Sequence, residues 1–410
     1  MRFKGKKLFK LTRVIILTVI AFVICMVIFP TAVFQASKAG VNAWWNIVFP
    51  ALLPFFISSE LLMSYGVIQF MGVMLEPVMR PLFNLPGVAS FVLAVGFTSG
   101  FPISASLAAR LREEKLCTRY EAEKLMCFTN NASPLFLLVA VGVGMFHNAR
   151  LGVIIAISHY AGNLLLGFIL RFYRADDPEY RPGIIYQGHL FRRAMDEMRK
   201  AFKANPRPFA GMLSDAITSS VNKLLVIGGF VIIFSVIIKV SALIGLTSLI
   251  TGVIGFIAIP LGFTKSAVQS LSSGFFEITL GTKAASEAAA PLIQRVVATS
   301  VILGWSGVSV LAQVSAMISK SDLRMGLFVL SRFLHSALAG LFCFLLLANE
   351  SVQAWLAQPL AAGSPNAQSL SWLGTLTYFS ELCLYTLLVW AALAAVVYVI
   401  RSLSIIRFKA

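Results

Sequence analysis

The chain has 410 residues, of which 58% are hydrophobic and only 12% are charged, and its mean hydropathy is +0.84. This composition excludes a soluble protein, because the polar side chains are too few to cover a water-exposed globule of this size. The formal net charge of +17 comes from Lys and Arg residues between apolar runs, which is typical of membrane topology rather than of nucleic-acid binding. The five cysteines are scattered without metal-ligand spacing, so we expect neither a disulfide framework nor a metal site, and no cofactor.

The N-terminal segment predicts a membrane anchor. Six basic residues up to Arg13 precede an apolar run, and no small-residue cleavage site follows that run. We therefore expect residues 1–40 to form an uncleaved signal-anchor helix with its N-terminus in the cytosol.

A basic linker divides the remaining chain into two halves. Residues 171–223 contain ten Lys or Arg residues, and this positive charge predicts a cytosolic linker over residues 173–222. The linker separates a first transport repeat at residues 41–172 from a second transport repeat at residues 223–348. An outer loop, a final membrane helix and a cytosolic tail are expected over residues 349–410.

The first half contains an interrupted apolar segment. Membrane crossings are expected near residues 43–65, 125–147 and 151–171. The uncharged stretch Pro81–Ala109 lies between the first two of these and has basic residues at both ends, which places both ends in the cytosol. The stretch therefore predicts a re-entrant hairpin, whose tip at Thr98-Ser99-Gly100 lies near the bilayer midplane.

The second half repeats this plan in the opposite orientation. Its crossings are expected near residues 223–245, 294–318 and 326–348. The interrupted segment Phe263–Ala285 has its predicted tip at Ser272-Ser273-Gly274, and a shift of 174 positions places Ser99-Gly100 on Ser273-Gly274. An odd number of crossings in each half inverts the second half, so its hairpin should open on the outer face. The predicted fold is an all-α polytopic membrane protein with two inverted-topology repeats, re-entrant hairpins and discontinuous helices.

Polar residues interrupt the helix that follows each hairpin. The segment Phe128–Pro134 places amides, hydroxyls and a proline in an apolar span, and residues 304–309 occupy the matching place in the second half. Both segments predict half-helices that face a ligand, because a membrane tolerates unpaired backbone groups only where a cavity, water or ligand satisfies them. Close interhelical packing is the alternative interpretation. The predicted substrate-binding residues are Thr98, Ser99, Gly100, Asn130, Asn131, Ser133, Ser272, Ser273, Gly274, Glu277, Trp305, Ser306 and Ser309.

Ionisable residues at membrane depth are further candidates for function. Glu277 is the strongest of them, because it lies three residues beyond Gly274, where the two halves should meet. An ion pair with Arg332 or Lys283 is an equally good interpretation of Glu277. Glu381 in the last helix lies outside the repeat, and we assign it a structural role.

Several of these motifs together resemble a known family. The two hairpin tips, the Phe128–Pro134 break and the segment GWSGVSV at residues 304–310 resemble the nucleoside-recognition, or gate-domain, membrane proteins. Nearly the whole chain resembles a family of sporulation integral membrane proteins, which is similar in plan to the concentrative nucleoside transporters. The resemblance implies an endospore-forming bacterium, the outer forespore membrane, and movement of dipicolinic acid from the mother cell toward the forespore. The Gln-Thr-Glu and Gln-Ser-Glu tips of the nucleoside transporters are replaced here by Thr-Ser-Gly and Ser-Ser-Gly.

Residues and resemblance together predict a secondary transporter of a small organic anion, with dipicolinate as its cargo. The two tips suit the two carboxylates, Asn130 and Asn131 can donate from the side, and Trp305 can supply an aromatic wall. A transporter of nucleosides or related small solutes, and a non-transporting sporulation scaffold, remain as alternatives. The pattern Gly304-Trp305-Ser306-Gly307 with His335 also fits an intramembrane serine protease, which we rank below these because the repeat already accounts for the pattern, so no enzyme is predicted.

The expected surroundings follow from the same reasoning. We predict a multi-pass protein of the outer forespore membrane or the cell membrane, with both termini in the cytosol. Its expected partners are the anionic substrate and the lipid bilayer, with no nucleic acid, and the sequence leaves oligomerisation open. No phosphate-binding loop of the Walker type is present, so ATP-driven pumping by this chain alone is not expected.

Overall fold

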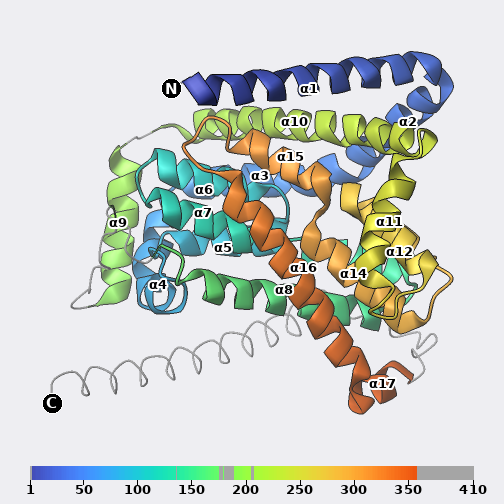
Figure 1. Cartoon of the computed structure of the whole chain (residues 1–410). Coiled ribbons are helices and arrows are strands. Elements are labelled where there is room, and N and C mark those ends of the chain that lie inside the picture. The colour runs from blue at the N-terminus through green and yellow to red at the C-terminus, as the bar shows by residue number, and fades with distance from the viewer. Residues whose placement is uncertain (1, 135, 175–178, 180–188, 205–206, 358–410) are drawn as a thin grey trace.

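The fold is helical throughout the described part of the chain. The computed structural model describes residues 2–134, 136–174, 179, 189–204 and 207–357, and within these ranges every regular element is a helix. Figure 1 shows α1 beside α10 along one side of the helical body and α9 across one end of it. Among the described residues, four helices are long and apolar enough to cross a membrane, or up to six if each bent pair is one span. The predicted class, an all-α polytopic membrane protein, is confirmed.

The N-terminal segment forms two helices rather than one. α1 (Arg2–Ile28) and α2 (Pro30–Ala43) meet at Phe29, and the chain bends there by 102°. Pro30 explains the bend, because a proline lacks the N–H that would continue the hydrogen-bond ladder of α1. The single helix expected over residues 1–40 is therefore corrected to a bent pair. A short π-helix, η1 (Trp44–Val48), and α3 (Phe49–Ser64) follow.

The first predicted re-entrant hairpin has its helix break at the expected glycine, Gly100. Gly66, with φ of 78°, turns the chain from α3 into α4 (Val67–Phe83). α5 (Ala89–Ser99) and α6 (Ile103–Glu113) then pack side by side. The break between them falls at Gly100, whose φ of 82° is costly for any residue with a Cβ atom. The predicted tip Thr98-Ser99-Gly100 therefore coincides with a real helix end.

The helix after this hairpin is discontinuous, as predicted. α7 (Arg119–Thr129) starts with a capping box between Thr118 and Glu121, which satisfies backbone donors at its first turn. α7 ends before Asn130, the next residues are not helical, and η2 (Phe136–Met145) continues the segment as a π-helix. α8 (Ala149–Leu170) then forms one uninterrupted span of membrane length.

The predicted linker contains more structure than its charge suggested. α9 (Leu190–Ala204) is amphipathic, and its aromatic rings pack on the first half: Phe191 contacts Phe70, and Phe202 stacks on Tyr65. α10 (Phe209–Leu243) starts after Pro208, inside the region expected to be linker, and has 35 residues. Its length of about 52 Å exceeds a hydrocarbon core of about 30 Å, so its first turns extend beyond the crossing expected at residues 223–245.

The second half repeats the order of helices but shifts one break. α11 (Leu246–Ala258), which the sequence did not predict, precedes α12 (Lys265–Phe276) and α13 (Ile278–Ser286). Ser272-Ser273-Gly274, expected at the tip, lies inside α12, and the break falls at Glu277 instead. α14 (Leu292–Trp305) and α15 (Gly307–Met317) are separated at Ser306, and α16 (Met325–Ala348) and α17 (Glu350–Ala357) follow. The final membrane helix and Glu381 lie outside the described residues.

The two halves share one hydrophobic core. Its largest cluster combines α4 to α7 residues such as Phe91 and Phe128 with Val310, Val314 and Phe328 from the second half. Because apolar burial crosses the boundary between the halves, polar groups near the breaks are enclosed by both halves at once.

Candidate functional site

The helix breaks lie against one another in pairs. A Cβ atom added to Gly100 would lie 2.9 Å from the amide nitrogen of Ser133 and 3.3 Å from the carbonyl oxygen of Asn131. In the second half, a Cβ atom added to Gly307 would lie 2.9 Å from the carbonyl oxygen of Phe276 and 3.1 Å from the Cα atom of Glu277. Each hairpin break therefore touches the break of the discontinuous helix that follows it, and several helix ends come together inside the protein.

A cluster of fully enclosed polar side chains surrounds the α7–η2 break. We call it the buried polar cluster, and each of its members is 0% exposed. Its members come from that break, from α8 and from α16: Asn130, Asn131, His159, Asn163, Arg332 and His335.

Arg332 closes the end of α7. Its guanidinium donates to the carbonyl oxygen of Asn130 at 3.0 Å and to that of Cys127, and it lies over the ring of Phe328 at 5.1 Å. A cation at this position is favourable, because the last carbonyls of a helix are unpaired and carry partial negative charge. Among the described residues, no acidic side chain pairs with Arg332.

Two histidines join α8 to α16 beside this guanidinium. Nε2 of His159 accepts from the amide of Ala132 at 3.2 Å, which assigns its proton to Nδ1. Nε2 of His335 donates to the carbonyl oxygen of His159 at 2.9 Å, and its Nδ1 accepts from Arg332 at 3.3 Å. The ring centroids are 4.6 Å apart. These bonds hold both rings in the neutral form next to a permanent cation.

An equivalent hydrogen bond occurs in each half. Nδ2 of Asn163 in α8 donates to the carbonyl oxygen of Phe128 at 2.5 Å, and Oγ of Ser336 in α16 donates to that of Val301 at 2.8 Å. Each bond joins residues 35 positions apart. In both cases the uninterrupted helix holds the preceding broken helix close to its break.

The buried polar cluster contains several hydrogen-bond donors without partners. Nδ2 of Asn130, Nδ2 of Asn131, Nδ1 of His159 and Nε of Arg332 have no hydrogen-bond acceptor in the described part of the chain. Oδ1 of Asn163 is an unpaired acceptor in the same cluster. Most buried polar groups in proteins are satisfied, so an enclosed group of donors without acceptors indicates a site for an acceptor-rich ligand.

The predicted residues of the first half are brought to this cluster in part. Asn130 and Asn131 belong to it, while Ser99 is buried with its hydroxyl unpaired among the described residues. Oγ of Ser133 accepts from the amide of Phe136 at 3.3 Å, which supports the start of η2. Thr98 is exposed, and its hydroxyl donates to the carbonyl oxygen of Ala94 at 2.9 Å.

The predicted serines and glycine of the second half serve helix packing. The hydroxyl of Ser272 donates to the carbonyl oxygen of Thr247 at 3.2 Å, and that of Ser273 donates to the carbonyl oxygen of Gln269 at 3.3 Å. Gly274 is in close contact with Gly281 of α13 and with Ile302 of α14. These contacts agree with the close-packing alternative for a small-residue pair, and the helix break expected here is corrected to Glu277. Contact of these three residues with a ligand stays a prediction.

The α14–α15 break is stabilised by its own contacts. The indole N–H of Trp305 donates to the carbonyl oxygen of Phe275 at 2.9 Å, and its ring stacks on Phe275 with centroids 5.6 Å apart. Ser306 has φ of 73°, and its hydroxyl donates to the carbonyl oxygen of Leu303 at 3.4 Å. Ser309 is buried in the first turns of α15.

Glu277 caps a helix. It is the N-cap residue of α13, and its Oε2 accepts from the amide of Leu280 at 2.8 Å. The ion pair proposed with Arg332 or Lys283 is not found among the described residues. Its carboxylate instead compensates the positive end of α13 at the second break.

Asn163 is a site residue that the sequence reasoning missed, and it shares α8 with His159. They lie four positions apart in α8, and therefore on one helix face, as do Arg332 and Ser336 in α16. A search for polar pairs four apart inside otherwise apolar spans would have found both helices.

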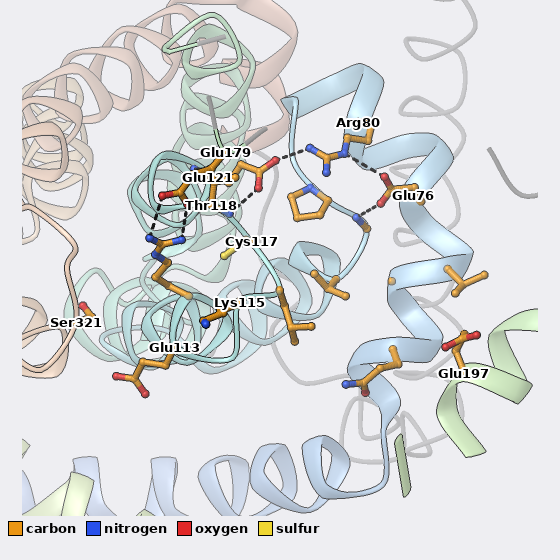
Figure 2. Close-up of a pocket in the computed structure, with 18 of the residues that line it drawn as sticks. Glu76, Arg80, Glu113, Lys115, Cys117, Thr118, Glu121, Glu179, Glu197 and Ser321 are labelled. Carbon is orange, nitrogen blue, oxygen red and sulfur yellow. Dashed lines mark hydrogen bonds and ion pairs between the residues drawn. The ribbon is translucent and has the colours of Figure 1, made fainter. Parts of the chain in front are cut away.

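A large charged cavity opens at the linker end of the molecule. It measures about 1050 Å³ and lies beside the start of α5 and the end of α6. Figure 2 shows Arg80 between Glu76 and Glu121. A second arginine also lines the cavity. That arginine, Arg112, contacts Oε2 of Glu179 at 2.7 Å and Oδ2 of Asp322 at 2.9 Å. Its hydrogen bonds hold the pKa of the Asp322 carboxyl below its ordinary value.

The comparisons with known proteins agree with this architecture. A family model described as Gate, nucleoside recognition, matches residues 46–159, which include the first hairpin, the α7–η2 break and His159. The chain is 44% identical over 328 residues to the sporulation integral membrane protein YlbJ of Bacillus subtilis strain 168, covering 77% of this chain and 78% of that protein. It is also 31% identical over 123 residues to an uncharacterized protein of Alkalihalophilus pseudofirmus, covering 28% of this chain and 26% of that protein.

Proposed function

The chain belongs to the family of the sporulation integral membrane protein YlbJ, and on that premise we propose that it is a secondary transporter of a small organic anion. The cargo that we propose is dipicolinic acid, moved from the mother cell toward the forespore across the outer forespore membrane. Both termini lie in the cytosol in this proposal, and the bilayer and the anion are the partners of the chain.

The observation that carries the proposal is the buried Arg332 guanidinium, which lacks an acidic partner in the described part of the chain. Burying a charge is costly unless a partner compensates it, and unpaired charges at membrane depth are usually retained for function. The unpaired amide donors of Asn130 and Asn131 lie in the same cluster. A carboxylate supplies only acceptors and one negative charge, so it satisfies the guanidinium and the amides together.

The helix breaks support alternating access. In this proposal α5–α6 and α12–α13 are re-entrant hairpins of two inverted repeats, opening to opposite sides of the membrane. The equivalent bonds from Asn163 and Ser336 support a common plan for the two halves. Rocking of one half against the other around the buried polar cluster would expose the cluster to each side in turn.

Nucleosides are the second candidate cargo, because the matching family model is described as nucleoside recognition. A nucleoside carries hydrogen-bond donors as well as acceptors, so its site needs acceptors from the protein. Oδ1 of Asn163 is the unpaired acceptor that the buried polar cluster offers, against four unpaired donors. This excess of unpaired donors over unpaired acceptors favours an anion as the cargo. A non-transporting scaffold remains the alternative outside the transporter class.

The protease alternative has little support from the geometry. The hydroxyl of Ser306 bonds its own helix at Leu303, and both ring nitrogens of His335 are engaged with Arg332 and His159. A nucleophile needs a base within hydrogen-bond reach, and the described contacts include none between Ser306 and His335. We therefore propose that the chain is not an enzyme.

Transport in reconstituted vesicles tests the proposed function. Purified protein is incorporated into liposomes, and uptake of labelled dipicolinate is compared with that of inosine and of benzene-1,3-dicarboxylate. We expect saturable uptake of dipicolinate that exceeds uptake of inosine. Faster uptake of inosine would move the assignment to nucleosides, and uptake of neither solute above protein-free liposomes would favour the scaffold.

A further inference from the structure

A second cavity lies at the end of the molecule opposite to the linker. It measures about 470 Å³ and is lined by residues from the end of η2 and from the connection between α13 and α14, among them His147, Lys283 and Arg295. α8 starts two residues after His147 and rises about 33 Å over its 22 residues. Beyond its other end, Tyr173 contacts Tyr120, next to residues of the large charged cavity. One membrane-length helix therefore separates the two cavities.

Charged groups without ion-pair partners line this second cavity. Lys283 lies in the last turn of α13, Arg295 in the first turns of α14, and Glu287 between these helices. None of the three forms an ion pair within the described part of the chain. The cavity therefore has two cations and one carboxylate, of which Lys283 and Glu287 are exposed to solvent, and a ligand with negative charge would gain from both cations.

Arg295 is held in place with part of its hydrogen-bonding capacity unused. One terminal nitrogen donates to the carbonyl oxygen of Ser286, and the guanidinium carbon lies 5.6 Å from the ring centroid of Phe146. Its Nε is buried and has no acceptor among the described residues. An arginine fixed at one end and stacked on a ring loses little side-chain entropy when it binds a carboxylate.

We propose that this second cavity binds a small carboxylate anion on the outer side of the protein, with Lys283 and Arg295 as the groups that pair with it. The inference rests on the proposed function, because it assigns to the cavity the same chemical class as the cargo. Glu287 opposes binding through its like charge, which suits a site that must release its ligand. The cavity would thus collect or release the anion at the outer mouth of α12–α13.

Protection of a single cysteine gives a local readout of binding. Ala140 lines the cavity and is half-buried, so Ala140→Cys is introduced into a chain whose native cysteines are replaced by alanine. The rate of its reaction with a small maleimide is measured in detergent as dipicolinate is added. We expect dipicolinate to protect the cysteine, and Lys283→Gln to raise the half-protecting concentration about threefold, as expected for the loss of one solvent-exposed ion pair.

Matched variants separate specific pairing from general surface charge. Lys265→Gln removes the same charge from an exposed position at the start of α12 that does not line the cavity, and it should leave the half-protecting concentration unchanged. Glu287→Gln should lower that concentration several-fold. An equal effect of Lys265→Gln, no protection by dipicolinate, or equal protection by inorganic phosphate would overturn the proposal.

The result can be separated from the fate of the proposed function. Protection in a protein that does not transport dipicolinate would leave the outer site standing and remove the transport assignment. Transport of dipicolinate without protection of the cysteine would support the transport assignment and remove the outer site. If replacement of the native cysteines prevents folding, the dipicolinate concentration that gives half of the maximal rise in unfolding temperature is compared for the unaltered chain, Lys283→Gln and Lys265→Gln. The same difference of about threefold is expected, and its absence would overturn the outer site.

Discussion

Arg332 of α16 donates to the carbonyl oxygen of Asn130 at 3.0 Å, a contact between residues 202 positions apart. A cation of the second half thereby ends a broken helix of the first half. A carboxylate that binds this guanidinium would compete with the carbonyl oxygens of Asn130 and Cys127 for the same donors. In the proposed transport cycle, anion binding and the packing of the two halves would therefore be coupled through one side chain.

Replacing Arg332 by methionine should reduce both stability and transport. The change leaves the carbonyl oxygens of Asn130 and Cys127 buried without a donor, at a cost of about 1–3 kcal/mol for each group. We expect a lower unfolding temperature and no dipicolinate uptake. Added dipicolinate should raise the unfolding temperature of the unaltered protein more than that of the variant, which keeps only the proposed outer site. A variant that is stabilised by dipicolinate to the same extent would contradict the proposed role of Arg332.

Asn131→Ala should harm transport more than Ser306→Ala. Asn131 is fully buried, and its Nδ2 has no acceptor among the described residues although its Oδ1 accepts from Asn163, whereas the hydroxyl of Ser306 is already bonded to Leu303. Loss of a donor to a charged cargo should cost about 1.5–3 kcal/mol, against about 0.5–1.5 kcal/mol for an ordinary hydrogen bond. The half-saturating dipicolinate concentration of each variant measures the difference. The reverse order, with His335→Ala as damaging as Ser306→Ala, would favour the protease.

Substitution of Gly307 tests the close approach of two breaks. Gly307→Ala places a methyl group 2.9 Å from the carbonyl oxygen of Phe276, at a residue whose φ is 78°. We expect destabilisation of about 1–3 kcal/mol, from strain and overpacking combined. Gly252→Ala in α11 is the matched control, since a Cβ atom there meets nothing within 4 Å. Equal unfolding temperatures for the two variants would show that the breaks can separate freely.

The uninterrupted helices were predictable because apolar runs and flanking charges determine them. α8 and α16 begin and end close to the crossings expected at residues 151–171 and 326–348. The break at Gly100 was also predictable, since a glycine shortly before Pro102 ends a helix by local stereochemistry. The start of α10 was not, because a count of positive charge locates a linker without showing whether the linker is helical.

The site was predicted less completely because its decisive contacts are not local. Gly274 was placed at a tip, yet its hydrogen side chain serves contact with Gly281 across the hairpin. A sequence does not distinguish a glycine needed for packing from one needed for a turn. Arg332 was recognised as a buried cation, but its acceptors are backbone carbonyls from the other half. Those acceptors carry no side-chain signature in the sequence.

Accessibility of two exposed lysines tests the orientation of the fold. In a chain without native cysteines, Lys200→Cys in α9 and Lys265→Cys at the start of α12 are placed at opposite ends of the molecule. An impermeant maleimide added to intact vegetative cells that carry the chain in their cell membrane should label position 265, and position 200 only after permeabilisation. Labelling of both positions from one side would contradict the proposed topology, which also predicts outer exposure for position 363 and cytosolic exposure for position 188, both outside the described residues.

Stability should depend on pH through Asp322 in a defined direction. Hydrogen bonds from Arg112 depress the pKa of the Asp322 carboxyl in the folded protein. The contribution of this pair to the free energy of unfolding is therefore fully present above the unfolded pKa of about 3.9. It is lost as the pH falls through the lower pKa of the folded protein. The pair is partly exposed, so Asp322→Asn should cost only about 0.5–1 kcal/mol at pH 7. Unfolding temperatures compared at pH 7 and pH 3 should show a smaller difference between variant and parent at pH 3. A difference that grows toward pH 3 would contradict this assignment.

In the proposed transport cycle, Arg112 would help to keep the cytosolic side closed. Its guanidinium on α6 holds Glu179 of the linker and Asp322 of the α15–α16 connection at the same time, so three separate parts of the chain meet at one group. Neither the linker nor the α15–α16 connection can separate from α6 until its ion pair with Arg112 dissociates. Dissolved salt weakens such exposed ion pairs. The time that the cytosolic side stays closed before each opening would therefore shorten as the ionic strength in the mother cell rises.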